Sequence, residues 1–577
     1  MKKLLIFCLL CLSVPLLRAQ EIEIDWSKPI VCDNKNFGFF ETFIGSNNEF
    51  VYAKYVNMAL SRKNQNSSVR IVAYDKETMK PVKEKVITGF KSEASKGKAY
   101  NGKTFYSNVV FDDQIIIFWL EHKDKKTAIY AESYAPDLKP LEKLQKVYEI
   151  KEEKVSPKIR SNKKAGSFAI ILYPSVDEEG HEIILDYAKV KSDLTVEEKD
   201  VVKLPFDKEE GFKDVSVQGS YGVEDDGKLY ALCSINQSNR KVIKRQYRSE
   251  SFIAEIDPAK GSSNVYDATI DDEDKSILSK TFSINSGTIY VYGFYRNSNE
   301  KDRKGNSGAD GVYISKISKA KEGLQDLKYT EFTKEFIEEL YATDPETQAA
   351  NKKAKPTKKK DKDKDDTGIR WTYEVEQSRV IDNDVIMVCT QEYNYSTTTC
   401  NSQGQCTTRY YCSKSDVTTI RMNLKGDVVW ASNLDRQITY SGWNVPDIEL
   451  IQRKDKLYLT YGNRFMEKQA DQKKKKAKSG ELMRDEFEYG VLDLKSGEVE
   501  KQTYRVNKPN TEKKDRKSVG ARGIQVVDNE MYVNSITTKM DPKKLYWCLI
   551  PVCGWYYYLM SPNTRVGTGY LGHIAAE

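Results

Sequence analysis

Side chains that could carry catalytic or metal chemistry are sparse in this sequence, apart from carboxylates. The three histidines, His122, His181 and His573, stand far apart in the chain, beside charged or strand-terminal residues. A Ser-His-Asp triad or a histidine-rich metal site needs at least one histidine with a convincing partner, and none is visible. No glycine-rich phosphate loop follows a strand and opens a helix. The sequence therefore predicts no metal site, no nucleotide site and no cofactor.

The ten cysteines are better suited to disulfides than to metal binding. Cys8 and Cys11 lie in an N-terminal apolar run, which leaves eight in the rest of the chain. An even count favours disulfides in an exported protein, and these eight include no CxxC pair and no neighbouring histidine. Whether Cys32 and Cys233 pair stays open. The candidates for disulfides are Cys389, Cys400, Cys406, Cys412, Cys548 and Cys553.

A segment rich in tyrosine and small polar residues could bind a partner. Residues 391–412 contain Tyr393, Tyr395, Tyr410 and Tyr411 among Ser, Thr, Asn and Gln. Binding loops favour these types, because tyrosine offers rigid amphipathic contact area and small polar side chains adapt their hydrogen bonds. We expect a binding loop here, braced by its cysteines.

A second candidate surface is the most apolar stretch after the N-terminus, residues 545–558. Its length and Pro551 exclude a membrane-spanning helix, so a hairpin with Cys548 and Cys553 around its turn is expected. The hairpin either folds back and buries its aromatic rings or exposes them to a partner. Its candidate binding residues are Trp547, Trp555, Tyr556 and Tyr557.

The first 19 residues have the plan of a secretory signal peptide. Lys2 and Lys3 precede an apolar run from Leu4 to Leu17, and cleavage is expected after Ala19. Neither cysteine of this run fits a lipoprotein signal, which favours simple release over a lipid anchor. No later stretch approaches the ~20 apolar residues of a membrane helix. We therefore expect an exported protein, periplasmic or extracellular, without a transmembrane segment.

Two lysine-rich inserts account for the basic net charge. The value of +7 includes three positive charges of the signal peptide. Residues 352–366 hold eight lysines and four aspartates, and residues 467–478 hold six lysines, one glutamate and one aspartate. The remaining body is acidic, which disfavours nucleic-acid binding, because that function needs a basic groove on the folded domain. Solvated, disordered inserts at about 350–368 and 466–480 are favoured over polyanion-binding arms.

An apolar strand pattern recurs eight times along the chain. In each copy Asn, Asp or Gly lies two places before an alternating apolar run, as Asp455 does before Leu457. The first residue suits a turn and the alternation suits a half-buried strand. The eight anchor positions are Phe50, Ile115, Phe168, Leu229, Ile289, Val385, Leu457 and Met531.

The spacing of these anchors predicts the architecture. A second strand follows each anchor, for example Ile71–Asp75 and Tyr489–Asp493, and the anchors recur at about 60 residues where no insert intervenes. Two clear strands with room for two more fit a four-stranded propeller blade. We predict an all-β fold in which residues 20–577 form a single β-propeller, with eight blades and seven as the alternative. Two stacked β-sandwiches are the competing fold, and one helix is expected at Phe332–Tyr341.

The two ends of the chain are expected to share one blade. The last unit ends at Ile574, three residues before the C-terminus, and lacks an outer strand. Residues 21–30 carry a strand pattern with Ile22, Ile24 and Trp26 on one face. Pairing of these strands would close the propeller and remove its open sheet edges.

Two segments resemble the repeat of pyrroloquinoline-quinone-type propellers. In Asn423–Trp430 and Leu492–Gly497 a strand ends in a polar residue and turns through glycine, and the first segment reaches a tryptophan. That family includes eight-bladed dehydrogenases and non-enzymatic envelope scaffolds. The vicinal cysteine pair of the quinone enzymes is missing here. The resemblance therefore implies the scaffold branch, without the quinone.

The sequence favours a binding or scaffold protein of the cell envelope, with a protein or glycan partner, over an enzyme. Each unit offers the same hairpin after its anchor strand, so the tyrosine loop, the insert at 467–478 and the tryptophan segment are expected on one face. The alternative is a carbohydrate-binding or carbohydrate-cleaving propeller with carboxylates at its centre. The identity of the partner and the oligomeric state do not follow from the sequence.

Overall fold

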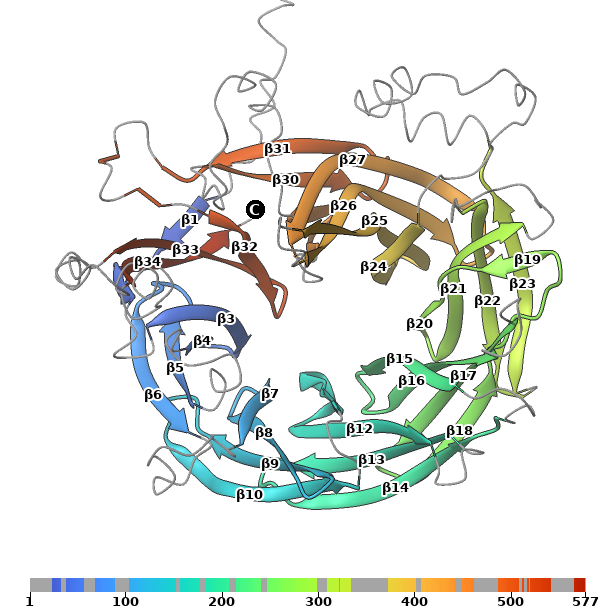
Figure 1. Ribbon diagram of the computed structural model, residues 1–577, viewed down its shortest axis with the longest axis horizontal. Helices are drawn as coiled ribbons and strands as arrows, with labels where there is room; N and C mark the ends of the chain where they lie inside the picture. The colour runs from blue at the N-terminus through green and yellow to red at the C-terminus, as the bar shows by residue number, and fades with distance from the viewer. Residues whose placement is uncertain are drawn as a thin grey trace, which may run out of the picture.

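The computed structural model shows a chain built almost entirely of β-strands (Figure 1). Its described residues contain thirty-four strands and one short 3-10 helix, η2 (Lys163–Ala165), so the all-β prediction is confirmed. No helix in this part of the chain is long and apolar enough to cross a membrane. The described residues are 23–32, 38–56, 68–88, 103–151, 156–176, 183–206, 214–239, 246–297, 309–320, 322–333, 372–400, 406–441, 448–460, 486–507, 511–512, 516–517, 519–540 and 565–575.

Several predicted segments lie outside these residues. They are the signal peptide, both lysine-rich inserts, and residues 334–341 of the expected helix.

The strands form eight antiparallel groups that follow one another along the chain, which we call units 1 to 8. Unit 1 contains β3 (Phe39–Ser46), β4 (Phe50–Val56), β5 (Ser68–Asp75) and β6 (Pro81–Thr88), and unit 2 contains β7 (Thr104–Val110), β8 (Ile115–Lys123), β9 (Lys126–Tyr134) and β10 (Pro140–Ile150). Unit 3 contains β11 (Lys158–Arg160), β12 (Phe168–Val176), β13 (Ile183–Lys191) and β14 (Val196–Leu204), and unit 4 contains β15 (Asp214–Val223), β16 (Leu229–Asn239), β17 (Gln246–Asp257) and β18 (Ser262–Asp267). Unit 5 contains β19 (Lys275–Ile277), β20 (Thr281–Asn285), β21 (Thr288–Asn297), β22 (Gly311–Ser318) and β23 (Gly323–Glu331), and unit 6 contains β24 (Thr372–Ile381), β25 (Asp384–Cys400), β26 (Cys406–Asn423) and β27 (Val428–Ser441). Unit 7 contains β28 (Glu449–Arg453), β29 (Lys456–Thr460), β30 (Glu486–Asp493) and β31 (Val499–Arg505), and unit 8 contains β32 (Val519–Val527), β33 (Glu530–Met540), β34 (Arg565–Ala575), β1 (Glu23–Trp26) and β2 (Ile30–Cys32).

The sequence repeat corresponds to one position in every unit. Each anchor residue lies at or near the start of the strand next to the innermost one, as Phe50 does in β4 and Leu457 does in β29. The strand that the sequence predicts after each anchor is also present, for example β5 and β30. Figure 1 shows the units arranged in a ring, an arrangement that is consistent with a β-propeller.

The eight units form seven hydrogen-bonded sheets, because units 4 and 5 share one. Their junction is a single parallel pair between Asp267 of β18 and Gly323 of β23. The same two units also pack across a hydrophobic cluster to which Tyr230 and Leu232 contribute from one side and Val291 from the other. The shared sheet therefore contains two separate units.

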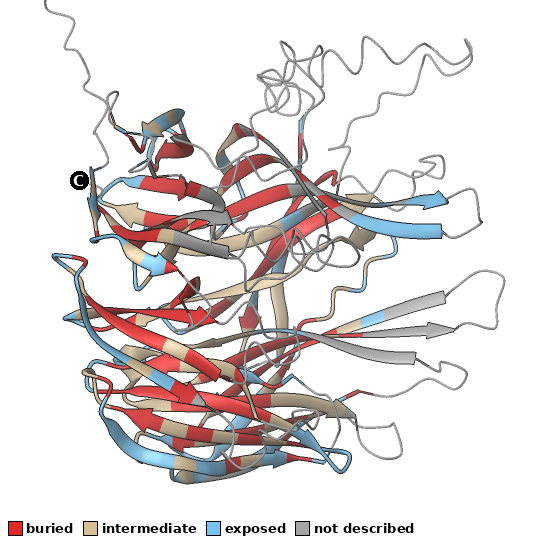
Figure 2. Cartoon of the chain, turned by 60° about the vertical axis from the view of Figure 1, so that its left-hand side comes forward, coloured by how far each residue is buried: buried red, intermediate tan, exposed pale blue. Residues whose placement is uncertain are grey.

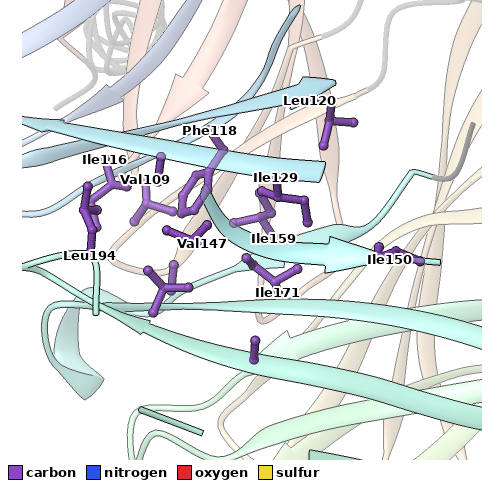
Figure 3. Packing of buried hydrophobic residues seen from close by; sticks show 14 of the residues in the cluster. Val109, Ile116, Phe118, Leu120, Ile129, Val147, Ile150, Ile159, Ile171 and Leu194 are labelled. Atoms are coloured by element: carbon purple, nitrogen blue, oxygen red, sulfur yellow. The ribbon is translucent and has the colours of Figure 1, made fainter. Parts of the chain in front are cut away.

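Hydrophobic clusters lie between consecutive units. Because strand residues alternate between the two faces of a sheet, each unit can pack on both of its neighbours. The cluster between units 2 and 3 gathers Phe118 of β8 and Ile171 of β12 (Figure 3). Another joins unit 8 to unit 1, where the rings of Tyr532 and Phe43 lie 5.2 Å apart. Figure 2 shows buried residues mainly in the middle of the strands and exposed residues toward their ends.

The N-terminal strand pairs with the C-terminal strand, as the sequence predicts. Trp26 of β1 lies opposite Gly572 of β34, and β2 extends the same edge, with Ile30 opposite Gly569. The buried Ser27 between these strands exchanges hydrogen bonds with Leu571: its backbone N–H donates to the Leu571 carbonyl, and its hydroxyl accepts the Leu571 N–H. The two ends of the chain therefore share one sheet.

Candidate functional site

The hairpin of β25 and β26 contains the tyrosine-rich segment. The two strands pair in register to the end of β25, where Cys400 lies opposite Cys406, and a disulfide joins these residues. One disulfide predicted among these cysteines is therefore confirmed. It closes the tip of the hairpin.

The outer half of this hairpin extends past the neighbouring strands. The first pair of β24 with β25 joins Thr372 to Glu392, and the last pair of β27 with β26 joins Tyr440 to Cys412. Beyond these pairs and as far as Cys400, the two strands pair only with each other among the described residues. Neither edge of the tip is therefore covered by a described strand.

The exposed side chains of the tip are polar and aromatic. The hydroxyls of Thr398 and Thr408 form a cross-strand hydrogen bond of 3.0 Å, and Tyr410 is 50% exposed. Other exposed residues of the tip are Ser396, Thr399, Thr407 and Arg409. This composition suits a polar binding surface.

The remaining predicted binding residues divide into two groups. Tyr395 lies opposite Tyr411 and Tyr393 lies opposite Ser413 in the hairpin, but the side chains of these three tyrosines are outside the described part of the structure. Residues 541–564 are also outside it, with Trp547, Trp555, Tyr556, Tyr557, Cys548 and Cys553.

The disulfide prediction is wrong for Cys389 and Cys412, because both are buried free thiols. Cys389 lies opposite Thr418, whereas Cys412 lies opposite Asn394, so the two cysteines are several positions out of register. A disulfide needs its two Cα atoms within about 7 Å. Burial raises the pKa of Cys412 to about 11 and that of Cys389 well above the ordinary value, which makes both thiols poor nucleophiles.

A buried ion pair lies at the base of the hairpin. Lys414 Nζ of β26 is 2.6 Å from Glu376 Oε1 of β24, and the two side chains are only 8% and 4% exposed. Glu376 also accepts hydrogen bonds from the Thr390 hydroxyl, at 2.6 Å, and from the Ile448 backbone N–H of unit 7, at 3.0 Å. Burial opposes the charge of Glu376, but Lys414 and Thr390 hold its pKa below the ordinary value.

The position of Glu376 depends on an irregularity of the inner strand. Val375 pairs with Cys389 and Gln377 pairs with Val388, so Glu376 is an extra residue on β24. Such bulges redirect a side chain out of the regular alternation. Glu376 can in this way reach Lys414, two strands away.

A second pair of carboxyl groups lies beside this ion pair. Glu374 is an exposed residue, but partial burial of its carboxyl group, followed by a hydrogen bond and repulsion from Glu392, raises its pKa to about 7. Lys414 is 3.8 Å from the Glu392 carboxylate on the other side. The site thus combines a glutamate that titrates near neutral pH, Glu374, with one that is kept ionised, Glu376. Groups with separated pKa values of this kind can serve as acid and base.

The sequence predicts central carboxylates only for the alternative function, and it does not identify these residues as their source. The sequence pattern that could have identified them is Glu374-Val375-Glu376, which places two acidic residues in the strand next to the anchor strand. The described residues contain no cluster of His, Cys, Asp and Glu suited to a metal ion.

The two histidines that the structure describes lie in different units, and each has a polar partner. His573 Nε2 lies 2.8 Å from Glu530 Oε2, His122 Nδ1 lies 3.0 Å from the Thr127 hydroxyl, and His181 is outside the described residues. The Asp-rich turns have structural partners. In one of them, Asp493 accepts backbone hydrogen bonds from Lys495 and Ser496.

The sequence matches no protein-family model and no curated protein sequence. Similar solved structures include an ulvan lyase of a new polysaccharide lyase family, with 9% identity, a TM-score of 0.36, and coverage of 85% of this chain and 96% of that chain. They also include a variant of the Synechocystis apocarotenoid oxygenase, with 9% identity, a TM-score of 0.34, and coverage of 84% and 92%. A prolyl endopeptidase shows 9% identity, a TM-score of 0.33, and coverage of 88% and 52%. Because these TM-scores are low, none of the three supports an inference about this chain.

Proposed function

We propose that this chain is an exported β-propeller of eight blades that binds a protein or glycan partner of the cell envelope through the β25–β26 hairpin. The observation that carries the proposal is the tip of this hairpin, which extends past its sheet neighbours and is closed by the Cys400–Cys406 disulfide. A rigid, exposed element loses little conformational entropy on binding. Its threonines, Arg409 and Tyr410 supply hydrogen bonds and aromatic contact area.

Eight blades are supported by the eight clusters between consecutive units, the last of which joins unit 8 to unit 1. Closure is supported by the pairing of β1 with β34. The signal pattern of residues 1–19 supports export, and the disulfide is compatible with an oxidising compartment. The likeness of Asn423–Trp430 to the pyrroloquinoline-quinone-type repeat supports the scaffold branch of that family.

The hairpin proposal predicts a local pattern of photo-crosslinking. A photo-reactive amino acid in place of Thr399, in the intact protein on its native cells, should form adducts with a defined protein or glycan. The same group in place of Leu141, which is 51% exposed on the outer strand β10, should not form them. Tyr410→Ala should reduce the Thr399 adduct several-fold, because it removes the aromatic contact.

Equal labelling at Thr399 and Leu141, or no defined adduct at Thr399, would overturn the proposal. Circular dichroism and the melting temperature of each variant serve as the folding control.

A second function, cleavage of a polysaccharide, is favoured by one observation. Glu374, with a pKa raised to about 7, lies beside the ionised Glu376 and the carboxylate Glu392. Glycoside cleavage uses one protonated and one ionised carboxyl group. In this function Glu374 would donate the proton to the leaving oxygen.

Cleavage predicts activity on at least one member of a polysaccharide panel, with a rate that falls as the pH rises through about 7. Glu374→Gln should lower kcat by about 100-fold, the usual contribution of a general acid, and should abolish that pH dependence. Glu273→Gln, a change in an exposed loop, is the matched control and should keep full activity. Absence of turnover, or a fully active Glu374→Gln variant, would exclude this second function.

A further inference from the structure

A cavity of about 460 Å³ lies on the inner strands of three consecutive units. Its walls come from β15 of unit 4, β20 of unit 5 and β24 of unit 6, and Figure 1 shows these strands on the inner side of the ring. Small-molecule sites have volumes of about 300–1,000 Å³. The cavity is therefore large enough for one or two sugar rings.

The chemistry of the lining is hydroxylic and acidic. The lining residues include Ser220, Thr281, Ser283 and Ser378, and none of the described lining residues is basic. Hydroxyl groups both donate and accept hydrogen bonds. A ligand rich in hydroxyls matches this wall, whereas an anion would find no positive side chain among its described residues.

Two of these hydroxyls are held in place across the junction of units 5 and 6. The buried Tyr292 hydroxyl donates to Ser378 Oγ at 2.7 Å and is also hydrogen-bonded to Ser283 Oγ. A hydroxyl fixed by one bond keeps further donor or acceptor capacity for a ligand. The wall is thus pre-organised, which reduces the entropy lost on binding.

Glu224 gives the cavity its charge preference. Its backbone is held in a tight turn, where its N–H donates to the Lys228 carbonyl and its carbonyl accepts the Gly227 N–H. The neighbouring Asp225 is paired with Lys164, at 2.9 Å. Among the described residues we find no ion-pair or hydrogen-bond partner for the Glu224 carboxylate. Burial, together with Asp225 and Asp226, raises its pKa, and a positive group beside the carboxyl would favour its ionised form and pair with it.

The other acidic lining residue, Glu376, is already neutralised by Lys414. Glu224 is therefore the carboxylate that remains for a ligand.

We propose that this cavity binds one or two sugar units that are neutral or carry an amino group, with the amine beside Glu224. The inference does not depend on the hairpin proposal. It also does not require turnover, so it stays distinct from the cleavage function.

Calorimetric titration of the full chain with glucosamine, glucose and glucuronate tests the site. Glucosamine should bind more tightly than glucose, and glucuronate should not bind. Glu224→Gln should lower the affinity for glucosamine by about tenfold, the effect of losing one charge-assisted hydrogen bond. The affinity for glucose should stay nearly unchanged. Asp226→Asn, in the same turn but outside the lining, is the matched control and should keep the preference for the amine.

Ser220→Phe provides a second variant, because Ser220 is exposed on β15 and its enlargement should block the cavity without disturbing the core. It should abolish binding of both sugars while the melting temperature is retained. Glucuronate binding as tight as that of glucosamine, an unchanged glucosamine affinity in Glu224→Gln, or no binding of glucosamine and glucose at millimolar concentrations would each overturn the proposal.

Discussion

Replacement of Lys414 by Met is expected to lower the free energy of unfolding by about 4 kcal/mol, the typical cost of removing one partner of a buried ion pair. In the wild type the Glu376 carboxylate is 4% exposed, and the variant leaves it with the Thr390 hydroxyl and the Ile448 N–H as its hydrogen-bond donors and with the favourable charge of Arg436. These two neutral donors do not compensate a buried charge. Urea unfolding monitored by circular dichroism gives the measurement.

A double-mutant cycle separates the ion pair from simple loss of packing. The combined variant Glu376→Gln/Lys414→Met removes both charges and should recover most of the stability, because a neutral pair needs no compensation. If the combined variant is as unstable as the sum of the two single variants, the pair does not act as proposed. Recovery would instead show that the two charges are coupled.

The difference in unfolding free energy between the wild type and Lys414→Met depends on pH with a defined sign. Lys414 and Thr390 hold the pKa of Glu376 below 4.5, so its contribution to stability is present above that pH and is lost as the pH falls through the folded-state pKa. Glu376 raises the pKa of Lys414 above 10.5, so the contribution of Lys414 is complete below that pH and is lost as the pH rises further. Lys414 also lowers the pKa of Glu374, which is about 7, so the difference in stability between the wild type and Lys414→Met should grow as the pH rises through about 7 and should shrink in acid.

The repeat of the units could be predicted because short stretches of sequence determine it. Each anchor strand follows a turn residue and pairs within its own unit, so short-range turn chemistry and strand alternation carry the information. Asn383 and Asn529, for example, have φ values of 64° and 62°, a left-handed conformation that asparagine tolerates. The same pattern predicted the second strand of each unit.

The carboxylate site could not be predicted, because it depends on a bulge and on distant pairing. Regular alternation would place Glu374 and Glu376 on one face, but the extra residue on β24 changes the direction of Glu376. Lys414 comes to it from β26, on the far side of the long hairpin. The disulfide prediction for Cys389 and Cys412 is wrong for a related reason. Cys400 and Cys406 lie opposite each other at the tip, whereas the strand register separates Cys389 from Cys412.

The junction of the first and last units is expected to depend on Asp528. In the turn between β32 and β33, its Oδ2 accepts the backbone N–H of Ser46 at 3.0 Å and the Ser46 hydroxyl at 2.7 Å. Lys163 Nζ of unit 3 lies 2.7 Å from the same oxygen. Three units therefore meet at this carboxylate, and Ser46 is fully buried.

Asp528→Gly should lower the free energy of unfolding by about 3 kcal/mol, because it leaves the buried N–H and hydroxyl of Ser46 without their acceptor. Glycine is the suitable replacement, since Asp528 has a φ of 51° and alanine would add backbone strain of its own. Asp528→Asn keeps an acceptor oxygen and should lose only about 1 kcal/mol. Lys163→Met should cost less than about 1 kcal/mol, because this ion pair is partly exposed.

Hydrogen exchange locates the effect within the molecule. Asp528→Gly should speed exchange first in β3 and β32, the strands that meet at this junction, while β21 and β22 of unit 5, on the opposite side of the ring, stay protected. If Asp528→Gly and Asp528→Asn lose the same stability, the charge of the carboxylate matters and its hydrogen bonds to Ser46 do not. A loss confined to Asp528→Gly, with early exchange in β3 and β32, would mean that the hydrogen bonds to Ser46 hold the last unit against the first.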